Sequence, residues 1–239
     1  MKSGQIIDAS FVSVPVQRNT REENAVIKEG AVPLEWDKTP NKLAHKDVDA
    51  RWTKKCGRSD YGYKNHVNMD RDMKLVAAQA CADASVHDSQ MLVAVLRWPE
   101  AGGEGVWADS AYRPVCRDSC TGRSEAQEQG LAGGGHCSQI HERAYLPVRC
   151  TQTGRDAPLS DEQRARNKAK SRVRARVEHV FGQMENGMGG MCLRSVGLAR
   201  AKVGVALMNL AYNLRRVEWL IRSKVLPFTR VTAPVLGAT

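Results

Sequence analysis

The stretch PLSDEQRARNKAKSRVRARVEHVFG, residues 158–182, holds the strongest helix pattern of the chain and its most uneven charge. Ser160 followed by two acids is typical of a helix N-terminus. Apolar side chains then recur at steps of four and three, which predicts one helix from Ser160 to about Met188. Seven Lys and Arg lie between Gln163 and Val177 without an acid, and Glu178 follows them alone. Because a solvated helix face usually mixes both signs, this run predicts a surface that binds polyanions.

The charge of the whole chain is concentrated in the same region. The formal net charge is +10 over 239 residues, and residues 160–224 account for +9 of it. This asymmetry favours nucleic acid as the partner, with an anionic membrane surface as the weaker alternative. No apolar run approaches the roughly 20 residues of a membrane span, and the N-terminus fits a strand better than a secretion signal. The sequence therefore predicts a cytoplasmic protein, associated with the nucleoid.

The seven cysteines are an odd number at irregular spacing, which favours a reducing compartment over a disulfide framework. Cysteine and histidine are the ligands that zinc prefers, and one group of them lies within 35 residues. None of its spacings is CxxC or HxxxH, so incidental thiols are favoured over a zinc site. The group consists of Cys116, Cys120, His136, Cys137, His141 and Cys150.

The other elements are predicted from apolar runs and turn residues. A strand is expected over residues 5–14, and a polar excursion with little regular structure over 18–58. Two strands joined by the turn MDRD follow at 61–68 and 74–81. A helix over 88–97, with Ser85 or Asp88 near its cap, precedes a short strand at 106–108. The last helix, over 198–223, carries a core-facing or partner-facing stripe of Val203, Leu207, Leu210, Leu214, Val217 and Ile221.

Three isolated acids, Asp8, Asp109 and Glu178, lie on separate predicted elements. Sites in α/β proteins form at strand ends and beside the helices packed on them, so a fold of this class can bring the three together. Carboxylates suit Mg²⁺, and two ions about 4 Å apart can serve phosphoryl transfer. Each acid taken singly also has a structural interpretation: a turn residue for Asp8, a helix cap for Asp109 and an ion-pair partner of Arg174 for Glu178.

At these residues the chain resembles the DDE transposases of bacterial insertion sequences, of the insertion-sequence-five type. The matching stretches cover about two thirds of the chain in the order of that family. They are GQIIDAS, DARWTKK, YGYKNHVNMD, ADASVHDSQ, WADSAYR, IHERAY, the quoted basic stretch, and MGGMCLRSVGLARAKVGVALMNLAYNL.

The resemblance implies an α/β, RNase-H-like fold: a mixed sheet flanked by helices, with a long basic helix and a C-terminal helix. One catalytic domain is expected over residues 1–224, with a loosely ordered insertion at 114–157 and a tail at 225–239. Asp8, Asp109 and Glu178 are expected to bind two Mg²⁺ or Mn²⁺ ions. The implied activity is cleavage and strand transfer of DNA, acting on transposon ends and target. A homo-oligomer is one assembly that the sequence leaves open.

The basic residues of the long helix are the predicted DNA-binding surface. Successive members are separated by about 200° around the helix, so they cannot all face one groove. Arg174 matches an Arg that relatives often place four residues before the Glu, whereas Ser171 and Glu185 stand where relatives often have Tyr and Lys. The predicted set is Arg164, Arg166, Lys168, Lys170, Arg172, Arg174 and Arg176.

Two departures from the family leave alternatives open. Relatives usually carry a helical DNA-binding module before the first catalytic strand, and Asp8 comes seven residues after Met1. We therefore expect the catalytic part of a longer transposase, with recognition of transposon ends lost or impaired. Residues 114–138 match poorly, and LPVRCTQTGRDA is extra. The alternatives are a catalytically inactive DNA-binding remnant and an RNase-H-like nuclease.

Overall fold

The computed structural model describes residues 4–55, 57–97, 105–112 and 159–225. The cysteine and histidine group at 116–150, the predicted insertion at 114–157 and the tail beyond Val225 therefore lie outside the described residues.

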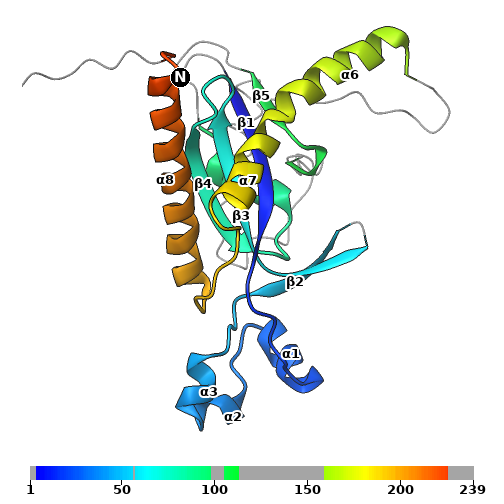
Figure 1. Cartoon of the computed structure of the whole chain (residues 1–239). Helices are drawn as coiled ribbons and strands as arrows, with labels where there is room; N and C mark the ends of the chain where they lie inside the picture. Colours follow the sequence, from blue (N-terminus) through cyan, green and yellow to red (C-terminus); the bar gives the residue numbers. More distant parts are fainter. Residues whose placement is uncertain (1–3, 56, 98–104, 113–158, 226–239) are drawn as a thin grey trace, which may run out of the picture.

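A mixed five-stranded sheet forms the centre of the described chain (Figure 1). Its strands are β1 (Gln5–Ser13), β2 (Arg51–Lys55), β3 (Arg58–Asp70), β4 (Val76–Asp83) and β5 (Val106–Ala108). The order is β2-β3-β1-β5, and β4 also pairs with β3. β1 runs antiparallel to β3 and parallel to β5. The predicted strands are confirmed, with β3 and β4 longer than or shifted from their predicted bounds.

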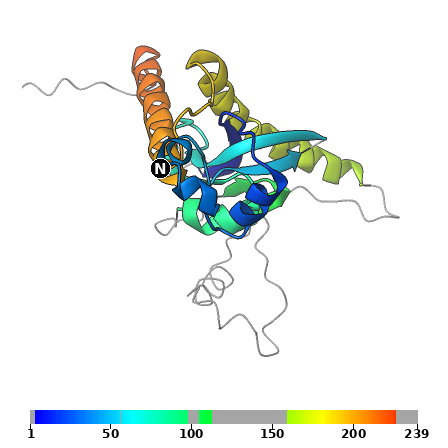
Figure 2. The same cartoon turned by 90° about the horizontal axis from the view of Figure 1, so that it is seen from below.

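Helices cover both faces of the sheet because neighbouring apolar residues of β1 point in opposite directions. Ile6 packs with Val177 and Val180 of one helix and Val205 of another. Ile7 packs on the opposite face with Leu92 and other residues of a short helix. Figure 2 shows the orange C-terminal helix and the yellow helix before it on one side of the sheet. The predicted α/β class, a mixed sheet flanked by helices, is confirmed.

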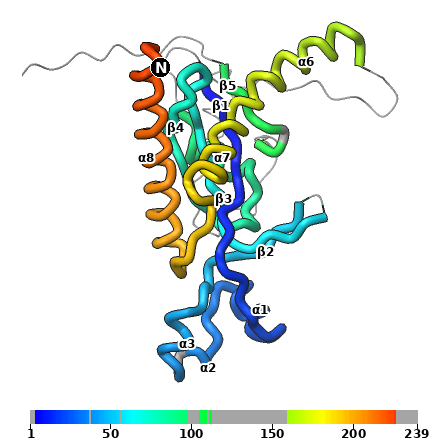
Figure 3. The backbone as a smooth tube through the Cα atoms, in the orientation of Figure 1, coloured from blue at the N-terminus to red at the C-terminus, as the bar shows by residue number. Residues whose placement is uncertain are grey.

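The basic stretch forms two helices and not the single one predicted. They are α6 (Asp161–Arg174) and α7 (Arg176–Gly187), separated at Ala175. The N–H of Glu178 donates to the carbonyl of Ala175 at 3.2 Å, a bond three residues back that tightens the turn. Ser160 caps α6 as predicted, in a capping box with Gln163. α7 packs on the sheet, whereas α6 buries no residue and projects from it (Figure 3).

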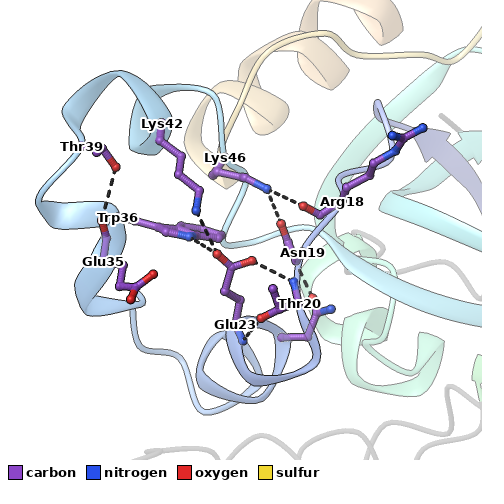
Figure 4. Close-up of polar contacts among 10 residues, drawn as sticks. Arg18, Asn19, Thr20, Glu23, Glu35, Trp36, Thr39, Lys42 and Lys46 are labelled. Atoms are coloured by element: carbon purple, nitrogen blue, oxygen red, sulfur yellow. Dashed lines mark hydrogen bonds and ion pairs between the residues drawn. The ribbon is translucent and has the colours of Figure 1, made fainter.

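The excursion contains regular structure, so the prediction of little structure there was wrong. It holds α1 (Arg21–Lys28), α2 (Leu34–Asp37), α3 (Pro40–Ala44) and β2. Figure 4 shows its centre: Trp36 is fully buried, and its Nε1 donates to Glu23 Oε1 at 2.6 Å. Hydrogen bonds from the Thr20 N–H, Trp36 and Lys42 lower the pKa of Glu23 to about 2. Thr20 and Glu23 form a capping box, whose spacing in the sequence is the signal that could have predicted α1.

The predicted helix at 88–97 is shorter than expected. A 3₁₀ turn, Asp88–Met91, leads into α4 (Leu92–Val95). Its N-cap is His87, whose side chain accepts from the N–H of Ser89. Ser85 instead bonds to Asp83, so it does not cap the helix.

The last helix, α8 (Leu198–Arg222), has the predicted position but buries a different face. Its buried residues are Ala201, Val205, Asn209, Tyr212 and Leu220. Val203, Leu207, Leu210 and Leu214 of the predicted stripe are each more than half exposed. The core-facing alternative is therefore wrong, and the partner-facing one stays a prediction. None of the described helices combines the length and the apolar character needed to cross a membrane.

Candidate active site

The parallel pairing of β1 and β5 brings Asp8 and Asp109 to neighbouring positions. Ile7 lies opposite Ala108 in the register, and each aspartate is the next residue of its chain segment. Burial raises the pKa of Asp8 above its ordinary value, and the negative charge of Asp109 raises it further. The N–H of Ala9, which donates to Asp8 Oδ1 at 2.8 Å, and the charges of Arg174 and Lys55 act in the opposite direction. The structure thus places two carboxylates together in a partly buried position.

Arg174, the last residue of α6, reaches this pair from the neighbouring helix. Its Nη2 lies 3.4 Å from Asp109 Oδ1, and both side chains are about one third exposed. Its Nε is buried and has no hydrogen-bond partner within the described part of the chain. Arg174 therefore compensates part of the negative charge while one of its buried donors stays available.

Glu178 lies on the first turn of α7, with an exposed side chain. Because the turn at Ala175 is tightened, Glu178 does not have the position relative to Arg174 that a continuous helix would give it. Over the described ranges, no three Asp, Glu, His or Cys side chains form a group that could hold a metal ion. The structure consequently joins Asp8 to Asp109 but does not gather Glu178 with them. Arg174 forms an ion pair with Asp109, whereas the sequence had suggested Glu178 as its partner.

A buried polar pair supports the turn that carries Asp109. Tyr112, in the 3₁₀ turn Ser110–Tyr112, places its Oη 2.8 Å from His66 Nδ1 of β3. Both residues are fully buried, and burial lowers the pKa of His66 to about 4. His66 is therefore neutral at pH 7 and can accept from, or donate to, the tyrosine hydroxyl. Neither residue was assigned a role from the sequence, although they lie in the family-like stretches YGYKNHVNMD and WADSAYR.

The predicted DNA-binding residues divide between solvent and the protein body. Arg164 and Arg166 are exposed near the start of α6, in ion pairs with Asp161 and Glu162. Lys168 and Arg172 are also exposed, and Lys170 is half-buried. Arg176 donates to the carbonyl of Arg71 at 2.8 Å and pairs with Asp72 at 3.1 Å. Arg174 and Arg176 thus attach the helices to the sheet, and the exposed basic surface belongs to the projecting part of α6.

Comparison with known proteins gives the same family as the resemblance. The family model of the transposase DDE domain matches residues 1–214. The chain is also 29% identical, over 185 residues, to the transposase for insertion sequence element IS1106 of Neisseria meningitidis serogroup B. That alignment covers 76% of this chain and 54% of the relative, so the chain spans about half of the relative's length. No solved structure matches.

The family accounts for the architecture around the two aspartates. A DDE transposase domain has an RNase-H-like fold, and the mixed sheet with helices on both faces agrees with it. Proteins of this family generally use divalent metal ions. With a family match over most of its length, the chain belongs to the transposase DDE domain family.

Proposed function

We propose that this chain is the catalytic domain of an insertion-sequence transposase, which cuts DNA and transfers the cut strand in a metal-dependent reaction. The observation that carries this proposal is the neighbouring position of Asp8 and Asp109 within a DDE domain. Their repulsion and the raised pKa of Asp8 mark a place where a cation would be stabilising.

The side chains at this place fit a hard divalent cation. Asp8 and Asp109 offer only oxygen donors, as Mg²⁺ and Mn²⁺ require. Glu178 is proposed as the third ligand because it lies one turn beyond Arg174, which contacts Asp109. When bound, the proposed two ions would activate a water or hydroxyl nucleophile and stabilise the leaving oxygen.

The rest of the site has roles that the chain's own residues can perform. The N–H of Ala9 holds one oxygen of Asp8, so the other remains for a ligand. The buried Nε of Arg174 can donate to a phosphate oxygen held at the aspartates. The exposed basic residues of α6 would contact neighbouring phosphates of the DNA, transposon end or target, without reading the bases.

Nicking of supercoiled plasmid with Mn²⁺ tests the proposal. We expect Asp8→Asn, Asp109→Asn and Glu178→Gln each to lower the nicking rate about 100-fold or more, the scale lost with a preorganised charged group. Glu185→Gln is the matched control, because Glu185 is an exposed acid of the same helix as Glu178. It should retain the wild-type rate. A wild-type rate in the three site variants would overturn the assignment.

One observation favours an alternative, a basic DNA-binding protein without catalysis. In the described part of the chain, Glu178 is not gathered with the two aspartates. The same assay separates the two functions, since this alternative expects DNA binding with no metal-dependent nicking by the wild-type protein. Nicking that depends on all three acids would reject it.

A further inference from the structure

The hairpin of β2 and β3 lies beside Asp109, one of the two aspartates. A pocket of about 280 Å³ lies there, lined by Asp109 and Ala111 together with Thr53, Lys54 and Lys55 of β2. The β2–β3 hairpin and Asp109 thus border the same pocket.

Two lysines of this pocket have no carboxylate partner among the residues that the structure describes. Lys54 and Lys55 are exposed, and neither forms a salt bridge within the described residues. Lys64, which also lines the pocket, is different: its Nζ lies 2.9 Å from Asp88 and donates to the carbonyl of Val86. The positive charge available to a ligand therefore comes from Lys54 and Lys55.

The arrangement of the two basic segments suggests what that ligand is. α6 and the hairpin project from the sheet in the same direction in both views (Figures 1 and 2). Asp109 pairs with Arg174 at the end of α6, and it also lines the pocket beside β2. A strand whose phosphate lies at Asp8 and Asp109 continues in two directions, with a charge every 3.4 Å or so along the duplex axis. One direction leads to α6 and the other to the hairpin.

We propose that Lys54 and Lys55 of the β2–β3 hairpin are a second DNA-binding element, which holds backbone phosphates of the strand beside Asp109. The inference rests on the proposed function and adds a surface that the basic-helix prediction did not contain. Lysines also protect edge strands such as β2 from pairing with other chains. Edge protection does not explain why these two line a pocket with Asp109, whereas phosphate binding does.

DNA binding without catalysis tests this inference. The affinity of a fluorescent 30-base-pair duplex is measured by anisotropy in EDTA at several salt concentrations. We expect Lys55→Ala to flatten the slope of log affinity against log salt by about one unit, and the Lys54→Ala/Lys55→Ala double variant by about two. Lys55→Arg should keep the wild-type slope, because the charge remains. Both lysines are exposed, so the variants should unfold at the wild-type temperature.

Arg58→Ala is the matched control on the same hairpin. Arg58 is 84% exposed, pairs with Asp60 at 3.2 Å and lines a different pocket, beside the segment that follows α7. It should change the slope by less than half a unit. A wild-type slope in the double variant, or equal effects of Arg58→Ala and Lys55→Ala, would overturn this inference alone. Failure of the wild-type protein to bind DNA would overturn the proposed function as well.

Discussion

At the scale of single residues, Asp8 combines a cost in stability with a role in the proposed chemistry. The strand that carries it is buried on both faces, and Asp8 is held beside a second carboxylate. Such a position is unfavourable for folding unless a cation is present, since burial and like charge both oppose ionisation. Functional sites commonly reduce stability in this way.

Asp8→Asn should therefore stabilise the protein in EDTA. A carboxyl whose pKa is raised by folding lowers the stability of the protein as the pH rises from the unfolded-state pKa towards the folded-state pKa. The gain of the variant over the wild type should accordingly be small near pH 4.5 and larger at pH 8. Thermal unfolding of both proteins over this pH range measures this gain. The titration of His66 contributes equally to the stability of both proteins and therefore cancels. Equal melting temperatures at pH 8 would show that Asp8 is not destabilising.

At the scale of elements, the start of α8 is capped by acids from a distant loop. The N–H of Leu198 donates to Asp49 Oδ2 at 2.7 Å, and that of Gly197 donates to Asp47 Oδ2 at 3.1 Å. Asp47 is buried and also accepts from the hydroxyl of Tyr63. The segment before β2 thus connects the excursion to the helix that packs against β4, and it satisfies N–H groups that would otherwise lack partners.

Replacing Asp49 tests this connection. Loss of a capping carboxylate costs about 1 kcal/mol, so Asp49→Ala should lower the melting temperature by about 2–4 °C in a protein of this size. Glu35→Ala, which removes an exposed acid of the same excursion, serves as the control and should leave it unchanged. If Asp49→Ala has the same melting temperature as the control, the cap contributes nothing measurable to stability.

At the scale of the whole molecule, the sequence predicted what depends on local patterns. The strands followed from apolar runs between turn residues, and placing Asp8 in β1 and Asp109 at the end of β5 made their proximity foreseeable. The break at Ala175 has no glycine or proline to signal it. The core around Trp36 depends on contacts with Glu23, thirteen residues away. Neither feature is visible in periodicity.

The exposed stripe of α8 shows a further limit of periodicity. Leu207 and its neighbours have the spacing of a buried face, yet the face that packs on the sheet contains Asn209 and Tyr212. Asn209 bonds to Asn65 and Gln79, and Tyr212 donates to the carbonyl of Lys74. Because these polar residues find specific partners across 130 residues or more, hydrophobicity alone could not identify the packed face.

The most direct measurement of the central claim is calorimetric titration of the protein with Mn²⁺. If Asp8, Asp109 and Glu178 hold the metal, the wild-type protein and Glu185→Gln should bind Mn²⁺ alike, and affinity should fall at least about tenfold in Asp8→Asn, Asp109→Asn and Glu178→Gln. Binding of Mn²⁺ with unchanged affinity in the two aspartate variants, or no binding by the wild-type protein, would contradict the assignment of this site as a metal centre.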